Sequence, residues 1–310
     1  MAELGNQRVK FLDVGHGDSS VVYLNNPDSE EKKVIIIDIA NADKLLTELG
    51  CNGVRVIELI VISHFDADHC RGINDFLEKF IAVGTVKRIC YNLDRRLPTK
   101  TMKLILKKFL ENHKRYRIGL ESGKVDALMP RKSLVSCDRT NLYLLYPDMT
   151  EETDAYLRND TNDNSIVCFL ENDVCRVLFS GDLEDRGWKM LLERIPALKC
   201  DVLKMPHHGA FYDGENGMGL KDILTILEPK DAVISSGHNP RYNHPGEDTV
   251  KLLKEAGINI YCTEFTGLCH DNMDDFERKC CGDTEVIIGD REYKIETETK
   301  NLRCLSHAVC

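Results

Sequence analysis

The stretch that decides the fold is Ile57-Glu-Leu-Ile-Val-Ile-Ser63, followed at once by His64-Phe-Asp66-Ala-Asp68-His69. The first seven residues are largely apolar and β-branched, which predicts a strand buried on both faces of a sheet. A helical pattern begins at Ile73 and runs to Ile81. The polar residues between them therefore lie where a strand gives way to a helix, the usual place for a site in an α/β sheet.

Four side chains of this polar stretch, His64, Asp66, Asp68 and His69, predict a metal site. Residues 64, 66 and 68 point to one side of an extended chain, and residue 69 turns inward as the helix begins. Gathering so many ionisable groups is unfavourable unless a cation compensates them. The alternative is a solvated loop with helix-capping aspartates, which explains one Asp but neither histidine.

Apolar runs elsewhere predict an α/β protein of two sheets packed on each other, with helices outside. Strand patterns cluster early in the 310-residue chain and again in its middle, and helical patterns are interleaved with them. The predicted strands are Val9–Val14, Ser20–Leu24, Lys33–Ile39, Leu142–Tyr146, Ser165–Leu170, Arg176–Phe179, Asp201–Met205, Ala232–Ser235 and Ile258–Cys262. The predicted helices are Asp43–Leu49, Thr99–Arg115, Arg186–Arg194, Lys221–Leu227 and Asp248–Ala256.

Three more polar motifs follow predicted strands of the second half. They are Ser180-Gly181-Asp182, His207-His208-Gly209 and Asn243-His244-Pro245. Each is weak alone, because Gly-Asp is common in turns. Their shared position after apolar strands makes them candidates for the same site.

The order of these motifs resembles the metallo-β-lactamase domain of the competence protein ComEC and its stand-alone soluble relatives. The matching stretches are FLDVGHGDS, IIIDIA, VISHFDADHCRGI, NDNSIVCFLE, VLFSGD, DVLKMPHHGA, NPRYNHP and TEFTG, from about Val9 to Gly267. The resemblance implies an αββα sandwich, with two facing mixed sheets flanked by helices, over residues 1–267. A Cys/His-rich C-terminal extension, residues 268–310, is expected to pack on this domain. Asp66 stands where the wider fold has a second His, as in the ComEC group.

The resemblance also implies a site with two divalent metal ions, zinc or manganese. The implied metal ligands are His64, Asp66, Asp68, His69, Asp182 and His207, with Asp182 as a bridging carboxylate. The implied catalytic residues are Asp68, His208 and His244. Of the histidine pair, His207 is favoured as the ligand. His16 and Asp18 are expected beside the metals and the substrate; relatives usually have Gln at the position of His16. Relatives also have a His before the Gly-Asp strand, where this chain offers only Asp160, Asp163 and Asn164.

The function implied is a metal-dependent hydrolase, most specifically a nuclease or phosphodiesterase that uses a metal-activated hydroxide. The net charge is −10, yet residues 95–132 carry twelve Lys or Arg and three acidic residues. This basic segment could bind nucleic acid, through Lys103 and Lys107 among others. The alternative for the segment is a solvated helix face. The alternatives for the function are hydrolysis of a small ester, lactone or phosphoester, and a partner-dependent or non-catalytic metal-binding subunit.

The 13 cysteines are predicted to be mostly reduced, because the count is odd and the spacing irregular. With no secretory signal and no apolar run long enough to span a membrane, we expect a cytoplasmic protein. Cys304-x-x-His307-x-x-Cys310, together with Cys269, has the residue types of a structural zinc site. The alternative is that some of these cysteines are simply buried apolar residues.

Overall fold

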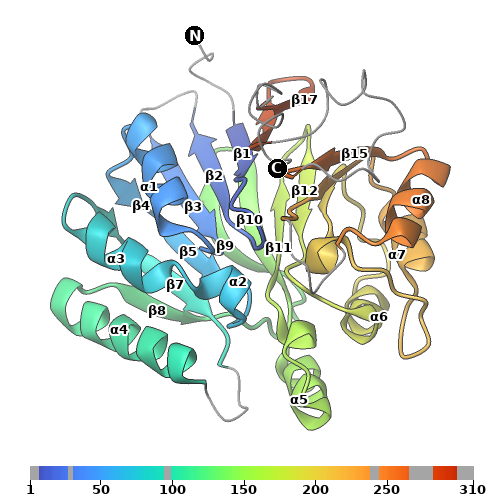
Figure 1. Cartoon of the computed structure of the whole chain (residues 1–310), viewed down its shortest axis with the longest axis horizontal. Coiled ribbons are helices and arrows are strands. Elements are labelled where there is room, and N and C mark those ends of the chain that lie inside the picture. Colours follow the sequence, from blue (N-terminus) through green and yellow to red (C-terminus); the bar gives the residue numbers. More distant parts are fainter. Residues whose placement is uncertain (1–6, 27–30, 94–98, 238–243, 265–281, 299–310) are drawn as a thin grey trace, which may run out of the picture.

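The computed structural model describes residues 7–26, 31–93, 99–237, 244–264 and 282–298. Two large sheets face each other, and helices cover the outer side of each (Figure 1). Residues 7–122 and 284–297 form the larger sheet and its helices, and residues 132–262 form the second sheet and its helices. The predicted αββα sandwich is therefore confirmed.

The larger sheet has eight strands and mixed direction. Its first five strands pair antiparallel, and from the fifth onward the pairing is parallel. In spatial order they are β17 (Tyr293–Thr297), β16 (Thr284–Ile288), β1 (Gln7–Phe11), β2 (Ser20–Asn25), β3 (Lys32–Ile37), β5 (Leu59–Ile62), β7 (Arg88–Tyr91) and β8 (Gly119–Ser122). A separate pair, β4 (Val56–Ile57) and β6 (Thr85–Val86), precedes β5 and β7.

The second sheet has seven strands. Its first four strands pair parallel and the remaining ones antiparallel. In spatial order they are β15 (Asn259–Cys262), β14 (Asp231–Ile234), β13 (Val202–Lys204), β12 (Arg176–Phe179), β11 (Val167–Glu171), β10 (Thr140–Tyr146) and β9 (Lys132–Cys137).

Three apolar layers hold the sandwich together. Between the sheets, Phe11 and Phe179 meet with ring centroids 5.8 Å apart. Outside the larger sheet, Phe76 and Phe109 bring α3 (Ile73–Ile81) and α4 (Lys100–Tyr116) onto the strands, and Trp188 of α6 (Asp185–Arg194) does the same for the second sheet. Each fully buried aromatic side chain of this kind contributes on the order of 2 kcal/mol through the hydrophobic effect.

Most of the helices lie on one outer face or the other (Figure 1). On the larger sheet are α1 (Ala42–Cys51), α3 (Ile73–Ile81) and α4 (Lys100–Tyr116), with the short α2 (Ala67–Cys70) at the strand ends. On the other side are α5 (Met149–Arg158), α6 (Asp185–Arg194), α7 (Leu220–Leu227) and α8 (Glu247–Glu255). Within the described residues, no helix is both long and apolar enough to cross a bilayer.

The region expected to form a C-terminal extension adds two strands to the larger sheet. β16 pairs antiparallel with β1, and β17 pairs with β16. These strands thus continue the sheet of the first domain at its edge. The four candidate zinc ligands, Cys269, Cys304, His307 and Cys310, lie outside the described residues, and a structural zinc there stays a prediction.

Candidate metal centre

One edge of the sandwich gathers the carboxyl ends of strands from both sheets. His64 follows β5, Asp182 follows β12, and His208 follows β13, while Asp18 lies two residues before the start of β2. The apolar strands end here because their next residues are polar and turn out of the ladder. Segments far apart in the sequence therefore deliver their side chains to a single place.

Four buried side chains form the centre of this site. Ligand atoms of Asp18, His69, Asp182 and His208 all lie within 4.8 Å of one another. Within this group, His69 Nε2 and Asp182 Oδ1 lie 3.1 Å apart. His64 lies beside them, with Nε2 3.8 Å from Asp182 Oδ2. The sequence placed these residues near one metal site, and the structure brings all five together.

The polar atoms that face this space suit a cation. Four of them are buried and lack a hydrogen bond: Asp18 Oδ1, His64 Nε2, and the two atoms of the 3.1 Å ion pair, His69 Nε2 and Asp182 Oδ1. Buried polar atoms are almost always hydrogen-bonded, so four such atoms around one point call for another partner. Imidazole nitrogens and carboxylate oxygens are the ligands that zinc and manganese accept. The donor set therefore fits a divalent metal ion.

A second group of ligands adjoins the first. Asp68 Oδ2 lies 3.1 Å from His16 Nε2 and 3.2 Å from His208 Nε2. His208 turns this nitrogen toward the site because its Nδ1 lies 2.8 Å from the carbonyl oxygen of Ser235. Burial alone would raise the pKa of Asp68, but the hydrogen bond from His208 and the charge of His69 hold that pKa below its ordinary value.

The site holds opposite charges in close contact. Burial would raise the pKa of Asp182, but the neighbouring His69 and His208 keep it well below its usual range. Burial would lower the pKa of His69, but Asp182 and then Asp38 raise it above the ordinary value. Binding a cation to this centre must therefore displace protons from imidazole.

Asp38, at the end of β3, is a functional residue that sequence reasoning did not single out. Its carboxylate accepts hydrogen bonds from the backbone N–H and the hydroxyl of Ser63, at 2.7 and 2.6 Å. Its Oδ2 also lies 2.8 Å from His69 Nδ1. A proton held on Nδ1 by this contact leaves Nε2 as the ligand atom. Asp38 thus orients His69 toward the centre.

Replacing Asp38 with Asn is expected to weaken metal binding about 10- to 100-fold, the usual effect of losing the partner of a metal-binding histidine. Isothermal titration of metal-free protein with zinc or manganese measures the change. Asp173→Asn, the same replacement in an exposed turn, serves as control. An unchanged affinity in Asp38→Asn would show that His69 keeps its orientation without this carboxylate.

Lys204, the last residue of β13, is also a member of the site that the sequence analysis did not select. Its ammonium group is buried and lies 2.9 Å from Asp18 Oδ2. Burial would raise the pKa of Asp18, but Lys204, followed by His208 and His69, lowers it. The signal in the sequence was a charged residue inside the apolar run DVLKM. Lys204 occupies one oxygen of Asp18 and leaves Oδ1 facing the centre.

The geometry of the histidine pair differs from the expected assignment, in which His207 was favoured as the metal ligand. His207 Nδ1 lies 3.0 Å from Glu184 Oε1, whereas His208 faces Asp68 and Asp182. The geometry therefore favours His208 as the ligand. Both residues have positive φ, 44° and 53°, and this turn decides which imidazole points inward.

Other candidate residues lie around the centre or away from it. His244 is partly buried, and its ring centroid is 5.4 Å from that of His207. Asp66 stands directly before α2 and is absent from both groups of ligands among the described residues. Lys103 and Lys107 are exposed on α4, and Figure 1 places this helix on the outer side of the larger sheet.

Asp163 lies in the region where the family resemblance implies another His. Its carboxylate accepts hydrogen bonds from Arg158 at 2.7 Å and from the backbone N–H groups of Glu184 and Gly187, each at 3.0 Å. Burial and then Asp160 raise its pKa to about 6 against the influence of Arg158. Asp163 thus fixes the start of α6, and its described contacts lead away from the centre.

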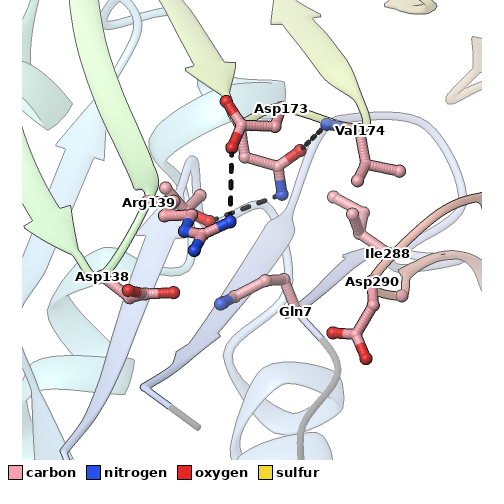
Figure 2. Close-up of a pocket in the computed structure, with 10 residues that line it drawn as sticks. Gln7, Asp138, Arg139, Asp173, Val174, Ile288 and Asp290 are labelled. Carbon is pink, nitrogen blue, oxygen red and sulfur yellow. Dashed lines mark hydrogen bonds and ion pairs between the residues drawn. The ribbon is translucent and has the colours of Figure 1, made fainter. Parts of the chain in front are cut away.

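A pocket of about 330 Å³ lies at the other end of the strands (Figure 2). Its lining comes from the start of β1 and from the turns after β9, β11 and β16. The lining contains three acidic residues, Asp138, Asp173 and Asp290, and one basic residue, Arg139. The guanidinium group of Arg139 lies 3.8 Å from Asp173. An acidic and partly exposed lining does not suit an anionic substrate. This pocket is therefore separate from the candidate site.

Comparison with known proteins gives two similar sequences. The chain is 25% identical to ComE operon protein 3 of Bacillus subtilis (strain 168) over 280 residues, which cover 84% of this chain and 32% of that protein. It is 24% identical to Competence protein ComA of Neisseria gonorrhoeae, over 72% of this chain and 26% of that protein. The chain thus spans about a third or less of these relatives. No protein-family profile matches it.

Solved structures that are similar at low identity include human tRNase Z, short form, and a diphosphatase from the PhnP family. The first has 14% identity and a TM-score of 0.48, covering 83% of this chain and 96% of its own. The second has 15% identity and a TM-score of 0.43, covering 91% and 98%. The chain has the αββα sandwich that the sequence predicted, and the predicted resemblance to competence proteins is confirmed by sequence similarity to these two relatives along most of its length.

Proposed function

We propose that this protein is a metal-dependent hydrolase that cleaves phosphodiester bonds in nucleic acid. The observation that carries the proposal is the cluster of buried carboxylates and imidazoles at this centre, where four buried polar atoms have no hydrogen-bond partner. Such a set is unfavourable in an empty protein interior and becomes favourable around divalent cations. Zinc or manganese would suit its mixture of nitrogen and oxygen ligands.

Two divalent cations at this centre would lower the pKa of water and neutralise charge on a phosphoryl oxygen. The chain itself fixes the geometry around them. Asp38 holds His69, and the carbonyl of Ser235 holds His208, each through Nδ1. Asp68 connects His208 with His16. Because these groups are already oriented, little reorganisation remains for the reacting state.

His244 is proposed to contact a substrate oxygen at the rim of the centre. Burial, and then His207 and His208, lower the pKa of His244 to about 4. The imidazole is therefore neutral at pH 7 and can donate one N–H to an oxygen of the substrate. A leaving oxygen is the natural acceptor for such a donor.

The preference for a phosphodiester rests on charge. The ligand set contains three carboxylates, Asp18, Asp68 and Asp182. Because these carry three negative charges, the site attracts an anion only when more than one divalent cation is bound. Helix α4 adds six Lys or Arg and one Glu within 17 residues. A basic helix surface of this kind binds phosphates, with an affinity that falls as salt rises.

A reducing, cytoplasmic setting is part of the proposal. Among the described residues, eight cysteines are free thiols, and seven of these are buried. Free thiols in such number are typical of compartments that keep cysteine reduced.

The decisive experiment is a cleavage assay on labelled single- and double-stranded DNA and RNA, with manganese, magnesium, zinc or EDTA. Metal-dependent cleavage is expected for the wild type and not for Asp68→Ala/His69→Ala. The matched control is Asp75→Ala/His113→Ala, which changes the same residue types on α3 and α4. Absence of cleavage by folded, metal-loaded protein, combined with hydrolysis of a small ester or lactone, would replace the proposed substrate class.

A further inference from the structure

We propose that His16 is a metal ligand of this chain, so that one of two ions is held by His16, Asp68 and His208. The inference rests on the proposed metal-dependent function and assigns His16 a role beyond contact with substrate. The second ion then falls to Asp18, His69 and Asp182. Asp182 Oδ2 lies 3.8 Å from His208 Nε2, close enough to join the two sets.

The distances among the three ligand atoms fit a single ion. His16 Nε2 and His208 Nε2 lie 3.1 and 3.2 Å from Asp68 Oδ2, and all three atoms are within 4.8 Å of one another. Ligands about 2.1 Å from a tetrahedral zinc ion are separated by roughly 3.4 Å. Small side-chain movements would therefore seat an ion among them. The two imidazole rings already face this point, with centroids 5.0 Å apart.

Hydrogen bonds hold the backbone around His16 against the short helix α2 and the residue that follows it. Arg71 donates a hydrogen bond to the His16 carbonyl oxygen at 2.7 Å, and the Asp18 N–H donates to the Asp68 carbonyl oxygen at 3.0 Å. Gly17, with φ of 131°, packs so closely on Asp68 that a Cβ there would collide with the Asp68 carbonyl oxygen. Such a turn, docked directly on residue 68, presents His16 at a fixed distance from the Asp68 carboxylate.

The division of the ligands between the two groups also allows each group to bind its own metal ion at the same time. His208 has only Nε2 to offer, because its Nδ1 is directed at the Ser235 carbonyl. If His208 bound the same ion as Asp18, His69 and Asp182, the other ion would have only Asp68 and His16 as protein ligands. Assigning His208 to Asp68 and His16 gives each ion at least three protein ligands, the number that catalytic zinc sites require.

Cobalt substitution tests the assignment without any hydrolysis assay. Metal-free protein is titrated with Co²⁺ while visible absorption is followed, and bound metal is counted by mass spectrometry after dialysis. Beyond any ion held by the C-terminal cysteines, we expect two ions per chain in the wild type and one in His16→Gln, or a second ion bound at least 10-fold more weakly. His113→Gln on α4 is the matched control and should bind as the wild type does.

His16→Cys provides a positive signature for the same site. A thiolate bound to Co²⁺ adds a sulfur-to-cobalt charge-transfer band in the near ultraviolet, and two ions should again bind. Two ions of wild-type affinity in His16→Gln, or a His16→Cys protein without the band, would overturn the proposal. If the wild type binds two ions but cleaves no nucleic acid, the proposed substrate class would be contradicted, while the assignment of His16 as a metal ligand would stand.

Discussion

Replacing Lys204 with Met is expected to lower the free energy of unfolding of the metal-free protein by about 3–5 kcal/mol, the range for breaking a buried ion pair from one side. Lys204 Nζ lies 2.9 Å from Asp18 Oδ2, and both side chains are almost fully buried. Without the ammonium group, Asp18 keeps its charge in a dry interior with Oδ1 already lacking a hydrogen bond. Urea unfolding in the presence of a chelator measures the loss.

The pH dependence and a second variant separate this effect from simple loss of packing. The folded pKa of Asp18 lies below its unfolded value, so its ionised form stabilises the wild type above about pH 4 and this contribution is lost at lower pH. The difference between wild type and Lys204→Met should therefore shrink in acid. Lys204→Met/Asp18→Asn should recover part of the stability. Lys199→Met, which breaks an exposed pair with Glu228, should change stability by less than about 1 kcal/mol. A comparable loss in the double variant would contradict the explanation.

The sequence predicted the buried strands well because their apolar character is local. The run IELIVIS and the runs around β3, β12 and β14 are buried on both faces, and burial of this kind leaves a continuous apolar pattern. Three of the four strands at the sheet edges, β8, β9 and β17, were not predicted. β8 (GLES) and β17 (YKIET) are half-exposed, and within the described sheet β17 pairs with β16. Pairing between residues so distant in sequence as β1 and β16 leaves no local signal.

Within the site, residue types could be predicted and side-chain directions could not. The histidines and aspartates of HFDADH, SGD and HHG could be recognised as site candidates because they follow apolar strands. The choice between His207 and His208 depends on two positive φ angles, which ordinary L-residues rarely adopt and no composition reveals. The contacts of Lys204 with Asp18 and of Asp38 with His69 join residues 186 and 31 positions apart. Only the assembled sheets bring them together.

Replacing Asp182 with Asn is expected to reduce metal-dependent hydrolysis by about 100- to 1,000-fold, because a lost share of metal-ion catalysis is worth several kcal/mol. Asp182 is the carboxylate nearest to most of the centre: Oδ1 lies 3.1 Å from His69 Nε2, and Oδ2 lies 3.8 Å from both His64 and His208. An amide keeps the shape of the side chain but removes its charge and one oxygen. Rate measurements over a range of metal concentrations give the effect.

The dependence on metal concentration decides what Asp182 does. If it bridges two ions, Asp182→Asn should need far more metal for half-maximal rate and should stay slow at saturation, because both the affinity and the placement of the ions are disturbed. If it only binds one ion, excess metal should restore most of the rate. Asp173→Asn, at the exposed acidic pocket on the other end of the strands, should match the wild type in both respects. A wild-type rate and metal dependence in Asp182→Asn would place the reaction at some other centre, since His64, His69 and His208 share no other carboxylate among the described ion pairs.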